Sequence, residues 1–330
     1  MQEATDIDSQ ALPEALLHAT EPVLLRGLVA QWPAVQAARE SASAADAYLR
    51  SFWRGATVGA WVGPPEIDGR FFYDDTYTGF NFRRELLKFD AVLDALARHA
   101  DDAAPPALYV GSTTVDTCLP GFRAENDLGF GNVDPLMSLW LGNRARVAAH
   151  QDLPDNLACV VAGRRRFTLF PPDALPDLYI GPLDVTPAGQ PVSLVDIARP
   201  DLQRFPRYAA ALQRAQVAEL GPGDAIFIPS LWWHHVEAME PFNLLVNYWW
   251  RSTPAAMDTP MNALLLALMT VRDLPPAQRQ AWRGVFEHYV FAADETTTAH
   301  IPADARGVLG PLDDNGRRML RAHLLKALNR

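Results

Sequence analysis

Three side chains of the types that ligate divalent metals fall into two groups along the sequence. His150 and Asp152 stand two residues apart in Val-Ala-Ala-His-Gln-Asp, and His234 follows much later in Leu-Trp-Trp-His-His-Val. Residues i and i+2 of a β-strand point to the same face, so His150 and Asp152 can offer an imidazole nitrogen and a carboxylate oxygen to one ion. A distant strand can add His234. Two histidines and one carboxylate on one face of an octahedral ion leave positions open, which is typical of non-haem Fe(II) sites.

The surroundings of His234 favour this interpretation over an ordinary buried His–Asp hydrogen bond, which a His-x-Asp pair alone would equally fit. A tight turn, Gly-Pro-Gly-Asp at 221–224, is followed by the apolar run Ala-Ile-Phe-Ile-Pro and then by Trp232 and Trp233. Aromatic bulk beside a metal excludes water and controls access to it. His235 is the next residue on the same strand, so it faces the opposite side and is interpreted as a structural histidine.

Short strands separated by turn residues are the elements that would position these side chains. The expected strands are 108–111, 136–141, 146–150, 157–162, 166–170, 216–220, 225–228, 235–238 and 244–250. So many short strands predict a mostly β fold, a closed or two-sheet architecture such as a jelly roll. The Pro-rich stretch 171–214 is too long for a plain loop and is expected to carry helix.

The regions before and after these strands are expected to contain more helix. Helical spacing of apolar residues predicts helices over 44–53 and 83–99, and 56–62 with 70–73 are expected to form a hairpin. Three helices are expected at 260–272, 276–291 and 314–328. We therefore expect a catalytic domain over 1–253 and a helical region over 254–330.

The first helix of this C-terminal region is apolar on nearly every side, from Met261 to Val271. A helix of that kind must be buried against something. Packing on its own domain and burial in a homodimer interface are both open, and the second makes the region a possible dimerisation element.

The composition limits the class of protein. Of 330 residues 49% are hydrophobic and 21% are charged, which is typical of a folded globular chain, and the formal net charge is −10. This acidity disfavours nucleic acid or an anionic membrane as the main partner. The two cysteines, Cys118 and Cys159, are too few for a disulfide framework, and no signal peptide or membrane-spanning run is apparent, so a cytoplasmic location is expected.

A longer series of motifs carries a family resemblance that runs from about residue 22 to 250. The motifs are Trp-Leu-Gly at 140–142, Ala-His-Gln-Asp at 149–152, Gly-Arg-Arg-Arg-Phe-Thr-Leu-Phe-Pro-Pro at 163–172, Gly-Pro-Gly-Asp-Ala-Ile-Phe-Ile-Pro at 221–229, Trp-Trp-His-His-Val at 232–236 and Val-Asn-Tyr-Trp at 246–249. This series resembles the cupin-like JmjC family of Fe(II)- and 2-oxoglutarate-dependent oxygenases, in the branch of the asparaginyl hydroxylase that acts on hypoxia-inducible factor. The resemblance implies a double-stranded β-helix with flanking helices, and it implies that His150, Asp152 and His234 hold the iron.

The resemblance also implies a site for the cosubstrate. The position where the family usually has a lysine for the distal carboxylate is Arg165, whose planar fork can pair with a carboxylate through two hydrogen bonds. Further positions that line the family's cosubstrate pocket are Tyr109, Asn156, Asn247 and Trp249. Val147 departs from the asparaginyl hydroxylase pattern, because a threonine there would supply one more hydrogen bond.

These residues lead us to expect an Fe(II)- and 2-oxoglutarate-dependent dioxygenase that uses O₂ to hydroxylate a C–H bond of a protein, peptide or amino-acid-like substrate. Two alternatives remain open: a non-catalytic cupin-type metal-binding or regulatory protein, and a metal-dependent enzyme of other chemistry on the same barrel. The aromatic residues Phe71, Phe72, Tyr73, Tyr77 and Phe80 are interpreted as a possible substrate entrance. The identity of the substrate cannot be derived from the sequence.

Overall fold

A computed structural model describes residues 1–187, 189–254 and 257–329. The chain divides into two compact units, Met1–Ser252 and Thr253–Arg330. No helix among the described residues combines the length and the apolar character that crossing a bilayer would require.

The first unit contains all the strands of the described chain. Its strands are β1 (Gln2–Ala4), β2 (Val23–Leu25), β3 (Thr57–Gly63), β4 (Arg70–Phe71), β5 (Arg83–Lys88), β6 (Ala107–Thr114), β7 (Leu136–Gly142), β8 (Ala145–His150), β9 (Asp155–Ala162), β10 (Arg165–Phe170), β11 (Gln216–Leu220), β12 (Ala225–Ile228), β13 (Trp233–Ala238) and β14 (Asn243–Trp250). Its helices are α1 (Glu14–Leu17), α2 (Pro33–Glu40), α3 (Ala42–Phe52), α4 (Phe89–Arg98), α5 (Val115–Cys118), α6 (Phe122–Glu125) and α7 (Tyr208–Gln213), with short 3-10 turns at Pro65–Ile67 and Pro172–Asp177.

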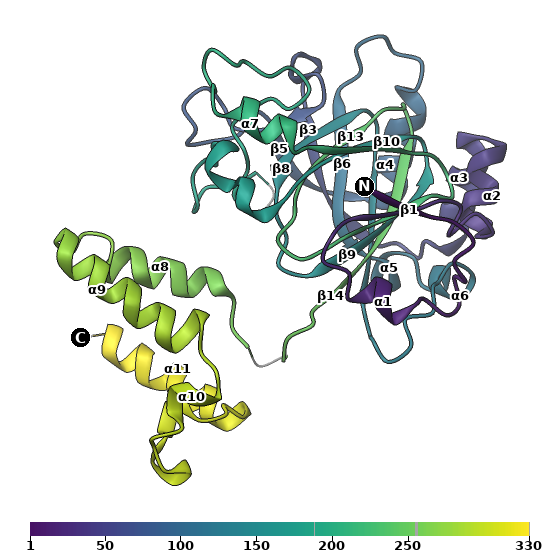
Figure 1. Cartoon of the computed structure of the whole chain (residues 1–330). Coiled ribbons are helices and arrows are strands. Elements are labelled where there is room, and N and C mark those ends of the chain that lie inside the picture. The colour runs from purple at the N-terminus through teal and green to yellow at the C-terminus, as the bar shows by residue number, and fades with distance from the viewer. Residues whose placement is uncertain (188, 255–256, 330) are drawn as a thin grey trace. The chain divides into compact units, whose positions relative to one another are not determined.

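The strands form two sheets, as the jelly-roll prediction requires (Figure 1). One sheet has nine strands in the order β1-β2-β12-β9-β14-β7-β6-β3-β5, and the other has five in the order β11-β10-β13-β8-β4. Apolar side chains of the two sheets meet in a shared core, where Ala158 and Val160 of the larger sheet pack with Phe167 and Leu169 of the smaller. The opposite face of the larger sheet is covered by helices, whose Val35 and Leu49 belong to the same core cluster as Leu157 and Cys159 of β9. The mostly β prediction with flanking helices is thus confirmed.

Two local predictions in the N-terminal region are wrong. Strands β3 and β4 do not form a hairpin, because β3 pairs with β5 and β6 in the larger sheet while β4 pairs in parallel with β8 in the smaller one. The expected helix over 83–99 begins only at Phe89, since the first six residues form strand β5 along β3. Leu86 suggested a helical face, yet it is 81% exposed at the edge of the sheet, so pairing with β3 overrides the local spacing.

The second unit contains α8 (Pro260–Thr270), α9 (Pro276–Phe286), a π-helical turn (Glu287–Phe291), α10 (Glu295–Thr298), two 3-10 turns (Ala303–Ala305 and Gly307–Leu309) and α11 (Asp314–Leu328). The three long helices lie close to their expected positions. Within the described part of this unit Thr297 is the one buried residue, and none of the hydrophobic core clusters reaches beyond Trp250. The apolar residues of these helices therefore have no core of their own in a single chain.

The turn between β9 and β10 is constrained by Gly163. This residue has φ +73°, and a Cβ built on it would lie 2.2 Å from Asn243 Oδ1 and 2.7 Å from the Phe242 carbonyl oxygen. Only glycine combines this backbone conformation with so close an approach. The turn fixes how two strands of opposite sheets enter the interior between them.

We predict that Gly163→Ala lowers the free energy of unfolding of the first unit by about 3 kcal/mol, because a left-handed backbone and a steric overlap add. Gly55→Ala is the matched control, since Gly55 has φ +95° but open space at its Cβ position. Its substitution should lower the free energy of unfolding by only about 1 kcal/mol. Urea denaturation followed by circular dichroism measures both, and equal losses would contradict the steric argument.

Candidate metal centre

His150, Asp152 and His234 converge at one end of the interior between the sheets. One ligand-type atom of each lies within 4.8 Å of the others. His150 and His234 are directly opposite each other in the β8–β13 pairing, with ring centroids 4.3 Å apart, and Asp152 Oδ2 lies 3.6 Å from His234 Nε2. The three side chains thus have the chemistry and the proximity to hold one ion.

Both imidazole rings are oriented by the backbone. Nδ1 of His150 lies 2.9 Å from the Ala148 carbonyl oxygen, and Nδ1 of His234 lies 3.0 Å from that of Trp232. A carbonyl oxygen only accepts, so each Nδ1 carries the proton and each Nε2 keeps its lone pair for a metal. Burial lowers the pKa of His234 to about 4, and the neighbouring His150 adds to this, so His234 is neutral at pH 7.

Backbone irregularities, rather than a regular strand, place the ligands. Strand β8 ends at His150, so Asp152 lies beyond it, held by the hydrogen bond from Leu231 N to its carbonyl oxygen at 2.9 Å. The expectation that strand alternation aligns the His-x-Asp pair is therefore wrong in its detail. A register shift between His234 and Val236 opposite β8 brings both Val147 and His150 to the cavity side, although they are three residues apart.

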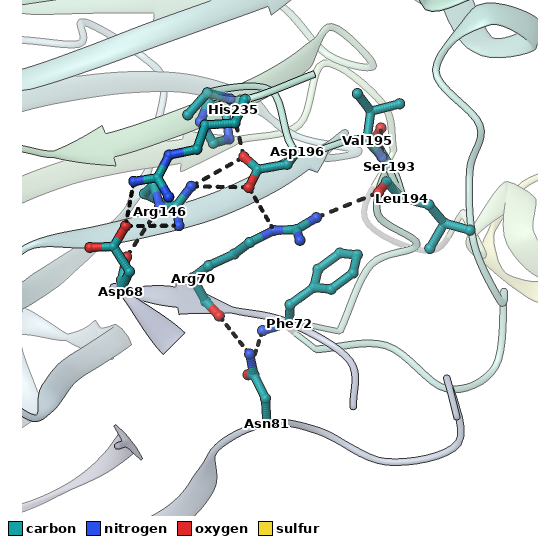
Figure 2. A network of polar contacts seen from close by, with 12 residues as sticks. Asp68, Arg70, Phe72, Asn81, Arg146, Ser193, Leu194, Val195, Asp196 and His235 are labelled. Atoms are coloured by element: carbon teal, nitrogen blue, oxygen red, sulfur yellow. Dashed lines mark hydrogen bonds and ion pairs between the residues drawn. The ribbon is translucent and has the colours of Figure 1, made fainter. Parts of the chain in front are cut away.

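His235 faces away from this site, as its position on the strand predicts. It is 3% exposed, neither ring nitrogen has a hydrogen-bond partner among the described residues, and burial lowers its pKa to about 4. Figure 2 shows it beside a network of charged groups on the outer side of β8 and β13.

The centre of that network is Asp196. Arg146 Nη1 lies 3.1 Å from both carboxylate oxygens of Asp196, and Arg70 Nε lies 3.8 Å from Oδ2 (Figure 2). Arg146 Nη2 also reaches Asp68 Oδ2 at 3.3 Å. A few residues before Asp196, Ser193 N donates to the Ala149 carbonyl oxygen at 2.7 Å. The network therefore fastens the segment around Asp196 along the strand that carries His150.

A cavity of about 330 Å³ opens beside these three candidate ligands, between the two sheets. It is lined by all eight residues assigned to the site from the sequence, namely His150, Asp152, His234, Arg165, Asn156, Tyr109, Asn247 and Trp249. The fold brings them together from strands β6, β8, β9, β10, β13 and β14 and from the segment after β8. Its size and its mostly apolar and aromatic wall are typical of a small-molecule site.

Arg165 is the most unusual group in this wall. It is 2% exposed, and its Nε and Nη2 have no hydrogen-bond partner among the described residues. Burial lowers its pKa, which Tyr109 partly opposes, and burial raises the pKa of Tyr109 to about 12. Nε and Nη2 form one edge of the guanidinium, the edge that can clasp a carboxylate through two parallel hydrogen bonds. An unpaired buried cation is strongly unfavourable, so this edge calls for an anionic ligand.

Several lining residues could not be assigned from the sequence, among them Trp61, Trp140 and Gln190. Trp140 belongs to the Trp-Leu-Gly motif at 140–142, but the sequence does not show that its indole contacts Asn247. Conversely, the aromatic residues between Phe71 and Phe80 are not among the described lining residues. Phe71 packs behind Trp61 at a centroid distance of 5.9 Å, so this cluster supports the cavity wall instead.

We predict that Asp152→Ala and His234→Ala each weaken Mn(II) binding by more than about 100-fold, because loss of a direct ligand exceeds the effect of losing an outer partner. His235→Asn is the control on the same strand and should leave one ion bound per chain with little change in affinity. Isothermal titration calorimetry on the metal-free protein measures this. Equal weakening by all three substitutions would contradict the assignment of the ligands.

The comparison with known proteins agrees with this geometry. The family model "Cupin-like domain" matches residues 9–256. The chain is 38% identical to the lysine-specific demethylase JMJ31 of Arabidopsis thaliana over 37% of its own length and 23% of that protein. It is 34% identical to the tRNA wybutosine-synthesizing protein 5 of Danio rerio over 37% of its length and 32% of that protein.

A longer alignment joins it to the Homo sapiens bifunctional peptidase and (3S)-lysyl hydroxylase JMJD7, at 28% identity over 69% of this chain and 77% of that protein. By contrast, the chain spans only about a quarter of the length of JMJ31 and of the HSPB1-associated protein 1 of Rattus norvegicus. Since the family model covers most of the chain and nearly all of its first unit, the protein belongs to the cupin-like JmjC family.

Proposed function

We propose that the protein is an Fe(II)- and 2-oxoglutarate-dependent oxygenase that hydroxylates a C–H bond. The observation that carries this proposal is the buried edge of Arg165 in the same cavity as the three metal ligands. In a site that only stores or senses a metal, a buried cation without an anionic partner would oppose metal binding. A dicarboxylic acid that also reaches the metal would satisfy both features at once.

Each group of cavity residues would have a separate role in this reaction. His150, Asp152 and His234 would hold the iron through two nitrogens and one oxygen, which leaves coordination positions for other groups. Arg165 and Tyr109 would bind and orient the distal carboxylate. The aromatic wall excludes water from the reacting groups. Iron and 2-oxoglutarate supply, when bound, the O₂-dependent oxidation of a C–H bond.

A protein or peptide side chain is the substrate class that we favour. The relatives JMJ31 and JMJD7 are named as a lysine-specific demethylase and a (3S)-lysyl hydroxylase, and both names point to lysine side chains. The wybutosine-synthesizing relative is named for tRNA, but a net charge of −10 does not suit a polyanionic substrate. The two free, buried cysteines support an intracellular, reducing environment.

We predict that Arg165→Ala raises the dissociation constant of 2-oxoglutarate by at least about 100-fold, because hydrogen bonds to a charged group in a buried site contribute about 2–3 kcal/mol or more. Arg165→Lys should recover most of this affinity. The measurements are calorimetric titration of the Mn(II)-loaded protein and succinate formation by the Fe(II)-loaded protein.

Arg166→Ala is the matched control. Arg166 follows on the same strand but faces the other side, where it pairs with Glu219 at 2.6 Å. Its substitution should leave 2-oxoglutarate binding unchanged. Binding of the acid without succinate formation under any condition would favour a non-catalytic cupin-type regulatory protein. Turnover that is indifferent to Arg165→Ala would favour a metal enzyme of other chemistry.

We also propose that the C-terminal helices form a homodimer interface. Helix α8 is apolar around its circumference, yet Leu264, Leu265 and Met269 are 43%, 47% and 66% exposed. Such a helix needs other apolar helices around it, and a second copy of the same unit provides them. The first unit carries the acidity of the chain, so two first units repel each other while the second units, with nearly balanced charge, do not.

The full chain is accordingly expected to sediment as a dimer at micromolar concentration. Leu265→Asp should shift it to the monomer, since a buried charge opposes association. Leu212→Asp is the control, because Leu212 is equally exposed, at 47%, but lies in the first unit. A chain that is monomeric across the micromolar range would contradict the proposal.

A further inference from the structure

A relay of three side chains crosses the floor of the cavity. Trp140 Nε1 donates to Asn247 Oδ1 at 2.6 Å, and Asn247 Nδ2 donates to Asn156 Oδ1 at 3.1 Å. The residues stand on β7, β14 and β9, which are adjacent strands of the larger sheet. Asn247 is 1% exposed and Asn156 is 7% exposed. Bulk water therefore cannot replace the hydrogen-bond partners of either amide.

The direction of this relay is set at one end. An indole N–H can only donate, whereas a carboxamide can present either its oxygen or its nitrogen to a neighbour. Asn247 must therefore turn its oxygen to Trp140 and its nitrogen to Asn156. Asn156 in turn has its oxygen occupied, and its Nδ2 has no acceptor among the described residues, so the group left for the cavity is an N–H donor.

The consequence is a group of three hydrogen-bond donors in the cavity wall. Arg165 offers Nε and Nη2, and Trp249 offers an indole Nε1 that is buried without a partner among the described residues. With Asn156 Nδ2 added, these groups all donate. A group of donors fits the oxygens of an organic anion and disfavours a ligand that presents its own donors to them.

We infer that Trp140 is a positioning residue that selects for the acid by fixing the orientation of Asn247 and, through it, of Asn156. This rests on the proposed function, since the acid is 2-oxoglutarate. Without the indole N–H both amides can turn over, and the oxygen of Asn156 then faces the cavity. An oxygen there repels a carboxylate that the nitrogen would have bound.

The test is a double-mutant cycle with Trp140→Phe and Asn156→Ala, read as the dissociation constant of 2-oxoglutarate on the Mn(II)-loaded protein. Trp140→Phe keeps an aromatic ring and removes the donor, and it should raise the constant about ten- to a hundredfold, the usual effect of one hydrogen bond to a charged group. In the Asn156→Ala background the same change should have an effect below about twofold, because the group through which Trp140 acts is absent. Mn(II) affinity should stay unchanged in every variant.

Trp53→Phe is the matched control, since its indole N–H also has an acceptor, the Ala56 carbonyl oxygen at 2.9 Å, outside the cavity. It should leave the constant unchanged. Equal effects of Trp140→Phe in both backgrounds, or none in either, would overturn the inference and leave the ring with a purely steric role. Failure of the unsubstituted protein to bind 2-oxoglutarate at all would overturn the proposed function, and this inference with it.

Discussion

A single cross-strand pairing, His150 opposite His234, is the interaction on which the site depends. Because β8 and β13 are neighbours in the smaller sheet, two residues far apart in sequence meet with their rings in contact. The register shift beside them lets β8 present Val147 and His150 to the same side. The charged network around Asp196 fastens the outer side of β8 through Arg146, so the strand that carries His150 is held by groups that face away from the cavity.

The interior between the sheets combines an apolar wall with a few buried polar groups whose partners are missing from the protein. Within the described chain Nε and Nη2 of Arg165 and Nε1 of Trp249 are unpaired there, while the amide oxygen and nitrogen of Asn247 each have one partner. Buried polar groups are almost always paired, so unpaired donors that line a cavity are candidates for contact with a ligand. The three candidate metal ligands share one cavity with these unpaired donors, and this combination supports the proposed site for a chelating acid over a simple metal store.

The sequence was sufficient for the architecture and for naming three side chains that the fold brings within reach of one ion. Many short strands between turn residues predicted a closed or two-sheet β fold, and His150, Asp152 and the Trp-Trp-His motif predicted the group of side chains that converges. What it missed depends on long-range pairing. Strand β5 has helical spacing but pairs with β3, and Arg70–Phe71 joins β8 instead of closing a hairpin. The hydrogen-bond relay Trp140–Asn247–Asn156 could not be predicted either, because it requires knowing that β7, β14 and β9 are neighbours.

The buried charge of Arg165, whose Nε and Nη2 have no partner among the described residues, also affects the stability of the folded chain. A ligand that binds only the folded state stabilises that state in proportion to the logarithm of its concentration. If a small acid neutralises this charge, then supply of the acid and resistance of the chain to proteolysis rise and fall together. Starvation for one metabolite would thereby shorten the lifetime of the protein, with no separate sensor domain required.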